Sequence, residues 1–119
     1  MEKIALMDFN FYHEEALKSA VYPNIGNNPH YPLMGLAGEV GEVAEKIKKL
    51  WRDKNQSKGA EFSAEDKEAI ALELGDVLWY VSALAREIGL PLEKVASLNL
   101  AKLGSRKQRN KVHGSGDNR

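Results

Sequence analysis

The chain has 119 residues, 43% hydrophobic and 29% charged, a composition typical of one soluble globular domain and not of a disordered segment. Seventeen lysines and arginines balance seventeen acids, so the net charge gives no attraction to nucleic acid or to an anionic membrane. There is no cysteine, which excludes disulfides and thiolate metal sites, and no apolar run approaches the roughly 20 residues that span a bilayer. We expect a cytoplasmic protein that binds neither nucleic acid nor membrane.

Hydrophobic periodicity predicts four helices and no strand. The first is expected at 8–21, with Asp8 as its N-cap. Residues 22–32 contain three prolines and three asparagines, which predicts an irregular loop. The second helix is expected at 33–52, because apolar residues recur there at helical spacing. That stripe consists of Leu36, Val40, Val43, Ile47 and Leu50.

The second half of the chain has clear helix boundaries. Ser63 is a predicted N-cap, and the third helix should run from there to a stop at Gly89. Proline suits the first turn of the fourth helix, expected at 91–103, and Gly104 is predicted to end it. We therefore predict an all-α, four-helix bundle-like protomer. Residues 1–104 form its domain, and residues 105–119 form a basic C-terminal tail.

A five-residue motif occurs twice in this sequence, with small changes. Glu-Val-Gly-Glu-Val at 39–43 returns as Glu-Leu-Gly-Asp-Val at 73–77, so each copy places two carboxylates three residues apart. Both pairs fall at one flank of a helical apolar stripe, and four carboxylates converge there if the two helices pack antiparallel. Such a cluster needs a cation, and oxygen-only ligation favours Mg²⁺ first and Mn²⁺ second. The predicted metal ligands and catalytic acids are Glu39, Glu42, Glu73 and Asp76.

The alternative for each acid pair is an ordinary solvent-exposed helix face. On such a face, Glu42 would form an ion pair with Lys46 one turn along. The glycines inside the two motifs indicate a functional role, since a glycine within a helix lowers helix stability by about 1 kcal/mol relative to alanine. Gly41 and Gly75 are understandable if the helix backbones, or a ligand, must approach closely.

Polar residues also interrupt the last helix on the side expected to face inward. Val95, Asn99, Lys102 and Arg106 share one stripe, which suggests a wet pocket with cationic donors for an anion. A bundle rim where the lysine reaches water is the alternative. Metal-binding acids beside such donors are the groups needed for chemistry on a phosphate chain.

Three segments together resemble a known family. Residues 36–45, 73–80 and 99–103 are similar to the MazG-like nucleoside triphosphate pyrophosphohydrolases of the all-α NTP pyrophosphatase superfamily. The resemblance covers nearly the whole chain, although Gly38 stands where many relatives carry a further glutamate. It implies Mg²⁺-dependent cleavage of NTP or dNTP to the monophosphate and pyrophosphate, in a homodimer or homotetramer. By this resemblance the metal-binding acids would be Glu39, Glu42, Glu73 and Asp76, and the substrate-binding residues Asn99 and Lys102. We predict Arg106 and Lys46 as further substrate-binding residues.

Other functions remain open on the sequence. One is a hydrolase for a single nucleotide, such as dUTP or dCTP, in place of a general housekeeping enzyme of the nucleotide pool. Another is a non-catalytic helical module, binding or regulatory, that uses its acidic cluster to hold a basic partner. The aromatic residues Trp51, Trp79 and Tyr80 are expected in a core or an interface more than in contact with a base.

Overall fold

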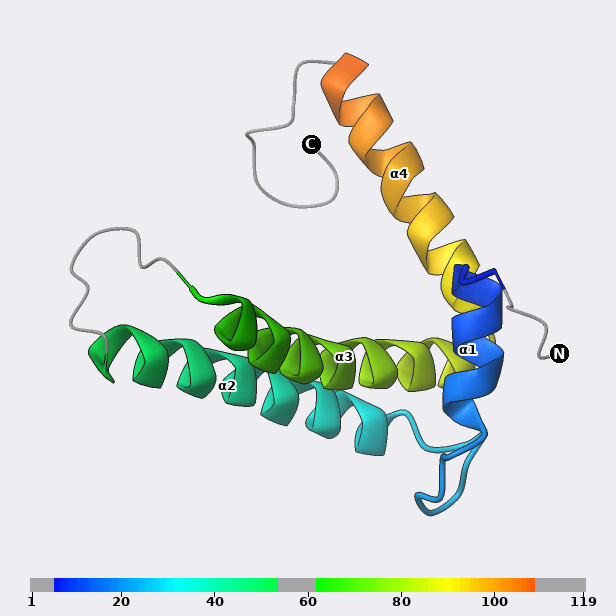
Figure 1. Ribbon diagram of the computed structural model, residues 1–119. Coiled ribbons are helices and arrows are strands. Elements are labelled where there is room, and N and C mark those ends of the chain that lie inside the picture. Colours follow the sequence, from blue (N-terminus) through cyan, green and yellow to red (C-terminus); the bar gives the residue numbers. More distant parts are fainter. Residues whose placement is uncertain (1–5, 54–61, 109–119) are drawn as a thin grey trace, which may run out of the picture.

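The computed structural model describes residues 6–53 and 62–108, which contain helices and no strand, so the all-α prediction is confirmed for this part of the chain. Two long helices form a hairpin, and the other two lie at one end of it (Figure 1). The helices are α1 (Phe9–Leu17), α2 (His30–Asp53), α3 (Ala64–Glu87) and α4 (Leu92–Gln108). Among the described residues, no helix is long and apolar enough to cross a membrane.

The four helices do not close into a bundle within one chain. α2 packs along α3, while α4 contacts α1 and α3 and makes no contact with α2. α4 instead leaves the hairpin at the end where α1 crosses it (Figure 1). The Cα radius of gyration is 17.5 Å, whereas a compact chain of this length would have about 13–14 Å. The prediction of a bundle-like protomer is therefore wrong for a single copy.

α1 begins where its N-cap predicts and ends earlier than expected. The Phe11 N–H donates to Asp8 Oδ1 at 2.7 Å, which satisfies one of the free N–H groups of the first turn. The helix ends at Leu17, with Lys18 as its C-cap. The last turn tightens, as the Ala20 N–H donates to the Leu17 carbonyl at 3.1 Å.

α2 begins at His30, inside the stretch predicted to be a loop. Pro32 is tolerated there because the first N–H groups of a helix have no partner within the helix, so a proline loses nothing. Its ring is fully buried, and the Asn28 side chain accepts from the Tyr31 N–H at 3.2 Å. The loop prediction is therefore wrong for residues 30–32.

The two later helices follow local capping signals with one exception. Ser63 and Asp66 form a reciprocal capping box at the start of α3, and Gly89 ends that helix with a φ of 79°. α4, however, continues to Gln108 and does not stop at Gly104. A glycine lowers helix propensity by about 1 kcal/mol without breaking the helix, and Gly104 has no positive φ. Of the predicted tail, residues 109–119 lie outside the described residues, as do 54–61 before α3.

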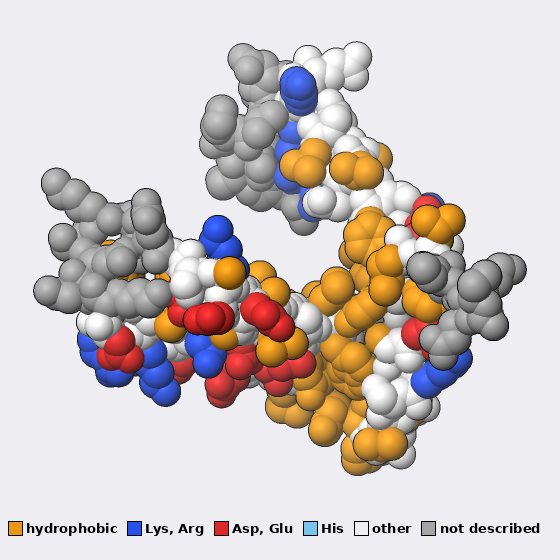
Figure 2. All heavy atoms as spheres, viewed as in Figure 1, with side chains coloured by type: hydrophobic (Ala, Val, Ile, Leu, Met, Phe, Trp, Pro, Cys, Tyr) orange, Lys and Arg blue, Asp and Glu red, His pale blue; other side chains and the backbone are white. Residues whose placement is uncertain are grey.

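The buried core is small and lies where α1, the loop after it, α3 and α4 meet. Figure 2 shows hydrophobic side chains gathered at this junction. Many other large apolar side chains are exposed, including several on the hairpin. The buried hydrophobic residues of the junction are Leu17, Tyr22, Ala83, Ala85 and Leu92.

Candidate metal centre

Three of the four predicted acids come together on the hairpin. Glu39 on α2 and Glu73 and Asp76 on α3 each offer an oxygen, and these atoms all lie within 4.8 Å of one another. Figure 2 shows acidic side chains gathered over the middle of α2 and α3. Glu42 is exposed one turn further along α2, outside this group.

The acids lie at an edge of the hairpin that is only partly closed to solvent. Glu39 and Glu73 are each partly buried, whereas Asp76 is exposed. Of the predicted apolar stripes, Val40 and Leu74 are 53% and 51% exposed, whereas most of the other residues of both stripes are partly buried.

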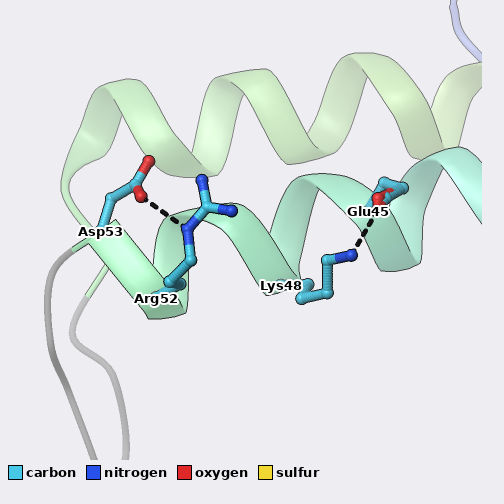
Figure 3. Close-up of polar contacts among 4 residues, drawn as sticks. All are labelled: Glu45, Lys48, Arg52 and Asp53. Atoms are coloured by element: carbon cyan, nitrogen blue, oxygen red, sulfur yellow. Dashed lines mark hydrogen bonds and ion pairs between the residues drawn. The ribbon is translucent and has the colours of Figure 1, made fainter.

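Negative charge accumulates in this cluster. Burial raises the pKa of the Glu39 carboxyl above its ordinary value of 4.5, and the carboxylates of Asp76, Glu73 and Glu42 raise it further. In the described part of α2 the ion pairs lie elsewhere (Figure 3): Lys48 Nζ with Glu45 Oε1 at 2.6 Å, and Arg52 Nε with Asp53 Oδ1 at 2.9 Å.

The anticipated pair between Glu42 and Lys46 is not among these ion pairs. Three carboxylates that repel one another, with no described cation paired to them, fit a hard divalent ion. The all-oxygen donor set matches the expected preference for Mg²⁺ or Mn²⁺.

Trp79 and Tyr80 form an aromatic wall beside the acids. Glu39, Asp76, Trp79 and Tyr80 line an open hollow of about 330 Å³. The Trp79 indole N–H donates to the Ala16 carbonyl at 2.9 Å, which ties the wall to α1, and its ring meets Tyr80 edge-on at 5.0 Å. The sequence predicts core or interface for these aromatics, and Trp79 does pack against the buried core. Their spacing was a usable signal, because residues three and four positions after an acid share its helix face.

Tyr12 is a second residue that the sequence analysis did not connect with the acids. Burial raises the pKa of its hydroxyl, and the nearby Asp76 carboxylate raises it further. α1 therefore brings a phenol within electrostatic reach of the cluster. No local pattern in the sequence predicts this approach, since 64 positions separate the two residues.

One glycine is required by the aromatic wall. A methyl group at Gly35 would fall inside the Tyr80 ring, so only glycine lets this ring lie against α2. By contrast, a methyl group at Gly41 or Gly75 would meet nothing within 4 Å. The close approach of α2 and α3 suggested for those two glycines is therefore wrong within one chain.

The predicted substrate-binding residues are not brought to the acids by this chain. Asn99 is exposed, Lys102 is partly buried and Arg106 is 4% exposed, all on α4. α4 makes no contact with the acid-bearing helix α2. Lys46 is partly buried on α2, one turn beyond Glu42.

An antiparallel helical hairpin that carries an oxygen-only acid cluster is the architecture expected of the all-α nucleotide pyrophosphohydrolases. Residues 28–110 match the MazG nucleotide pyrophosphohydrolase domain, and the chain belongs to this family. The match includes the hairpin with all of its acids and the whole of α4. The family resemblance predicted from the sequence is thereby confirmed.

Individual relatives agree with this assignment. The chain is 42% identical to the Gene 37 protein of Mycobacterium phage L5 over 118 residues, which cover 95% of this chain and 100% of the phage protein. It is 32% identical to human dCTP pyrophosphatase 1 over 100 residues and 31% identical to the rat enzyme over 87. These matches span 58% and 48% of the mammalian proteins and about three quarters of this chain. No solved structure matches the chain. The similarities support activity as a nucleotide pyrophosphohydrolase, a hydrolase of acid anhydrides.

Proposed function

We propose that the protein is a Mg²⁺-dependent enzyme that hydrolyses nucleoside triphosphates, NTP or dNTP, to the monophosphate and pyrophosphate. The observation that carries this proposal is the convergence of Glu39, Glu73 and Asp76 on the hairpin. Membership in the MazG family supplies the reaction class. A housekeeping role in the nucleotide pool follows from that reaction.

The donor set suits the proposed ion. Glu39, Glu73 and Asp76 would hold it, and Glu42 is close enough to influence the Glu39 carboxyl and to join them after a side-chain rotation. When bound, a divalent ion neutralises phosphate oxygens and lowers the pKa of a coordinated water. Mn²⁺ accepts the same oxygen ligands and is the expected substitute.

The chain's own residues would handle the proton and the substrate. One carboxylate of the acid cluster would act as the general base. Trp79 and Tyr80 present flat apolar surfaces beside the acids, where a planar ring can stack.

We also propose that the enzyme works as a homodimer or homotetramer. Apolar side chains of the hairpin are too exposed for a stable single copy, with Leu72 at 69% and Met34 at 66%. Because α4 makes no contact with α2 in the same chain, Asn99 and Lys102 would reach an acid cluster most directly in another copy. This arrangement would bring donors for the phosphates to the acids of the neighbouring subunit.

A narrower specificity for dCTP is the second candidate. The observation in its favour is the similarity to the mammalian proteins named dCTP pyrophosphatase 1. The remaining alternative is a non-catalytic module that binds a basic partner through its acids.

A substrate panel tests all three proposals. The protein is incubated with each of the common NTPs and dNTPs and Mg²⁺, and products are separated by ion-exchange chromatography. We expect monophosphate and pyrophosphate in equal amounts, and none when EDTA replaces Mg²⁺. Preference for dCTP over the other seven nucleotides by more than about tenfold in kcat/KM, equal to about 1.4 kcal/mol, would establish the narrower enzyme. Diphosphate and orthophosphate as products, or no turnover of any nucleotide, would refute the proposed reaction.

A further inference from the structure

The loop between α1 and α2 is held by one carboxylate. Glu87, the last residue of α3, accepts from the Tyr22 hydroxyl at 2.5 Å, the Gly26 N–H at 2.7 Å and the Asn28 N–H at 2.6 Å. Three short hydrogen bonds to an ionised acceptor are stronger than bonds between neutral groups. They favour the charged form, and the pKa of Glu87 is lowered, first by the bond from Tyr22. The carboxylate thus joins residues that lie about 60 positions apart in the sequence.

Tyr22 carries this attachment to the start of α2. Its side chain is 5% exposed, and the neighbouring Arg86 donates to its hydroxyl at 3.2 Å. The Tyr22 ring stacks on Tyr31 in the first turn of α2, with centroids 5.0 Å apart and planes 6° apart. The position of Tyr31 is therefore tied to the loop that Glu87 holds.

Tyr31 in turn contacts the aromatic wall of the hollow. Burial raises the pKa of the Tyr80 hydroxyl and the nearby Tyr31 phenol raises it further, and Tyr80 lines the hollow together with Glu39 and Asp76. Gly35, one turn after Tyr31, leaves the space that the Tyr80 ring fills. A continuous set of contacts therefore runs from Glu87 through Tyr22 and Tyr31 to the acid-lined hollow.

We propose that Glu87 is a positioning residue for the acid-lined hollow: by clamping residues 22–28 it fixes Tyr31, which fixes Tyr80 against Glu39. Glu87 does not line the hollow, so its effect passes through the stack of Tyr22 on Tyr31 and the contact of α2 at Gly35 with the Tyr80 ring. Its consequence for turnover rests on the proposed function, whereas its effect on the Tyr80 side chain does not.

The test uses Glu87→Gln in the full chain, with the exposed Glu68→Gln on the same helix as control. A glutamine offers one oxygen where the carboxylate offers two, so its amide group must face at least one of the three donors. The chain has four tyrosines, and labelling them with ¹³C at Cζ gives four NMR signals that single Tyr→Phe variants assign. We expect the Tyr80 signal to shift in Glu87→Gln and to stay unchanged in Glu68→Gln. An unchanged Tyr80 signal in folded Glu87→Gln would overturn the proposal.

Kinetics separate positioning from simple stabilisation. We expect Glu87→Gln to raise KM about tenfold and to change kcat less than about twofold, because binding suffers when the wall is misplaced while the acids remain. A lowered melting temperature with KM unchanged would show a structural role only and would refute positioning.

A second variant covers the outcome in which Glu87→Gln does not fold. Tyr31→Phe keeps the ring stack and removes only the hydroxyl, so it should move the Tyr80 signal and raise KM without unfolding the chain. A Tyr80 signal that does not respond to Tyr31→Phe would overturn the proposed route. If the wild type turns over no nucleotide, the proposed function fails, and the NMR signals still decide whether Glu87 positions Tyr80.

Discussion

The junction at the end of the hairpin and the middle of the hairpin are built in opposite ways. At the junction, apolar residues such as Leu17 and Leu92 are buried. In the middle of the hairpin, Glu39 and Glu73 are partly buried, whereas Val40 and Leu74 are 53% and 51% exposed. Burial can stabilise the first region within one chain. In the proposed enzyme, a cation bound by the acids and a second copy over the exposed apolar side chains would stabilise the second region, and four predictions test this contrast.

The largest effect should come from removing the clustered acids. We expect Asp76→Asn and Glu73→Gln each to lower kcat/KM at least 100-fold, equal to about 2.7 kcal/mol of transition-state stabilisation, because ligands of the proposed ion are lost. Pyrophosphate release with saturating Mg²⁺ measures this loss. Glu68→Gln on the same helix should keep wild-type activity. Folded variants that retain activity would rule out these acids as ligands.

The exposed apolar side chains of α3 should control assembly. We expect the double variant Leu72→Lys/Leu74→Lys to shift the mass measured by light scattering after size exclusion towards that of one 13.2 kDa chain. Burying two lysines in an apolar contact is unfavourable, while lysines on a free surface change stability by only about 0.5 kcal/mol. Glu68→Lys changes the net charge by the same +2 and should leave the mass unchanged. A wild type that is already monomeric would contradict the proposed assembly.

The aromatic wall distinguishes two glycines on α2. Gly35→Ala should lower the free energy of unfolding by roughly 1–3 kcal/mol, because the new methyl group overlaps the Tyr80 ring. Gly38→Ala meets nothing within 4 Å and should raise it by up to about 1 kcal/mol through helix propensity. Urea denaturation in EDTA measures both changes. Equal effects of the two substitutions would refute the close contact at Gly35.

The smallest expected effect is on the stability of the metal-free protein and comes from the charge of Glu39. The pKa of Glu39 is raised in the folded state, so the folded chain binds its proton more tightly, and stability falls as pH rises from 4.5 through the folded pKa. We expect Glu39→Gln to raise the melting temperature at pH 7 by about 2 °C in EDTA. This gain should shrink as the pH is lowered towards 5. A gain that persists unchanged at low pH would exclude relieved repulsion as its cause.

The sequence predicts most of the local structure correctly, because the signals for helix ends are short-range. Asp8, Ser63 and Gly89 each act on residues within one turn, and each marks a boundary as expected. Pro32 and Gly104 mislead for a related reason. Both disfavour a helix on average, but a first-turn proline and an isolated glycine are tolerated when neighbouring residues continue the helix.

The candidate site is predicted only in part. The doubled acid pattern identifies three residues that converge, Glu39, Glu73 and Asp76, but does not show that Glu42 stays outside their group. Val40 and Leu74 are apolar and yet exposed in this chain. The contribution of Trp79 and Tyr80 follows from their spacing to Asp76. The attachment of the loop to Glu87 has no local signal, since it depends on how α1 crosses α3.

Trp79 also gives the protein an internal fluorescent reporter. Its indole lines the acid hollow, while the other tryptophan, Trp51, is 49% exposed and lies about 18 Å along α2 from Glu39. In a Trp51→Phe variant, all tryptophan emission therefore comes from beside the acids. Paramagnetic Mn²⁺ quenches nearby indole emission, whereas Mg²⁺ does not. Comparing the Trp79 emission in titrations with the two ions would therefore report whether the hollow is occupied, without any turnover.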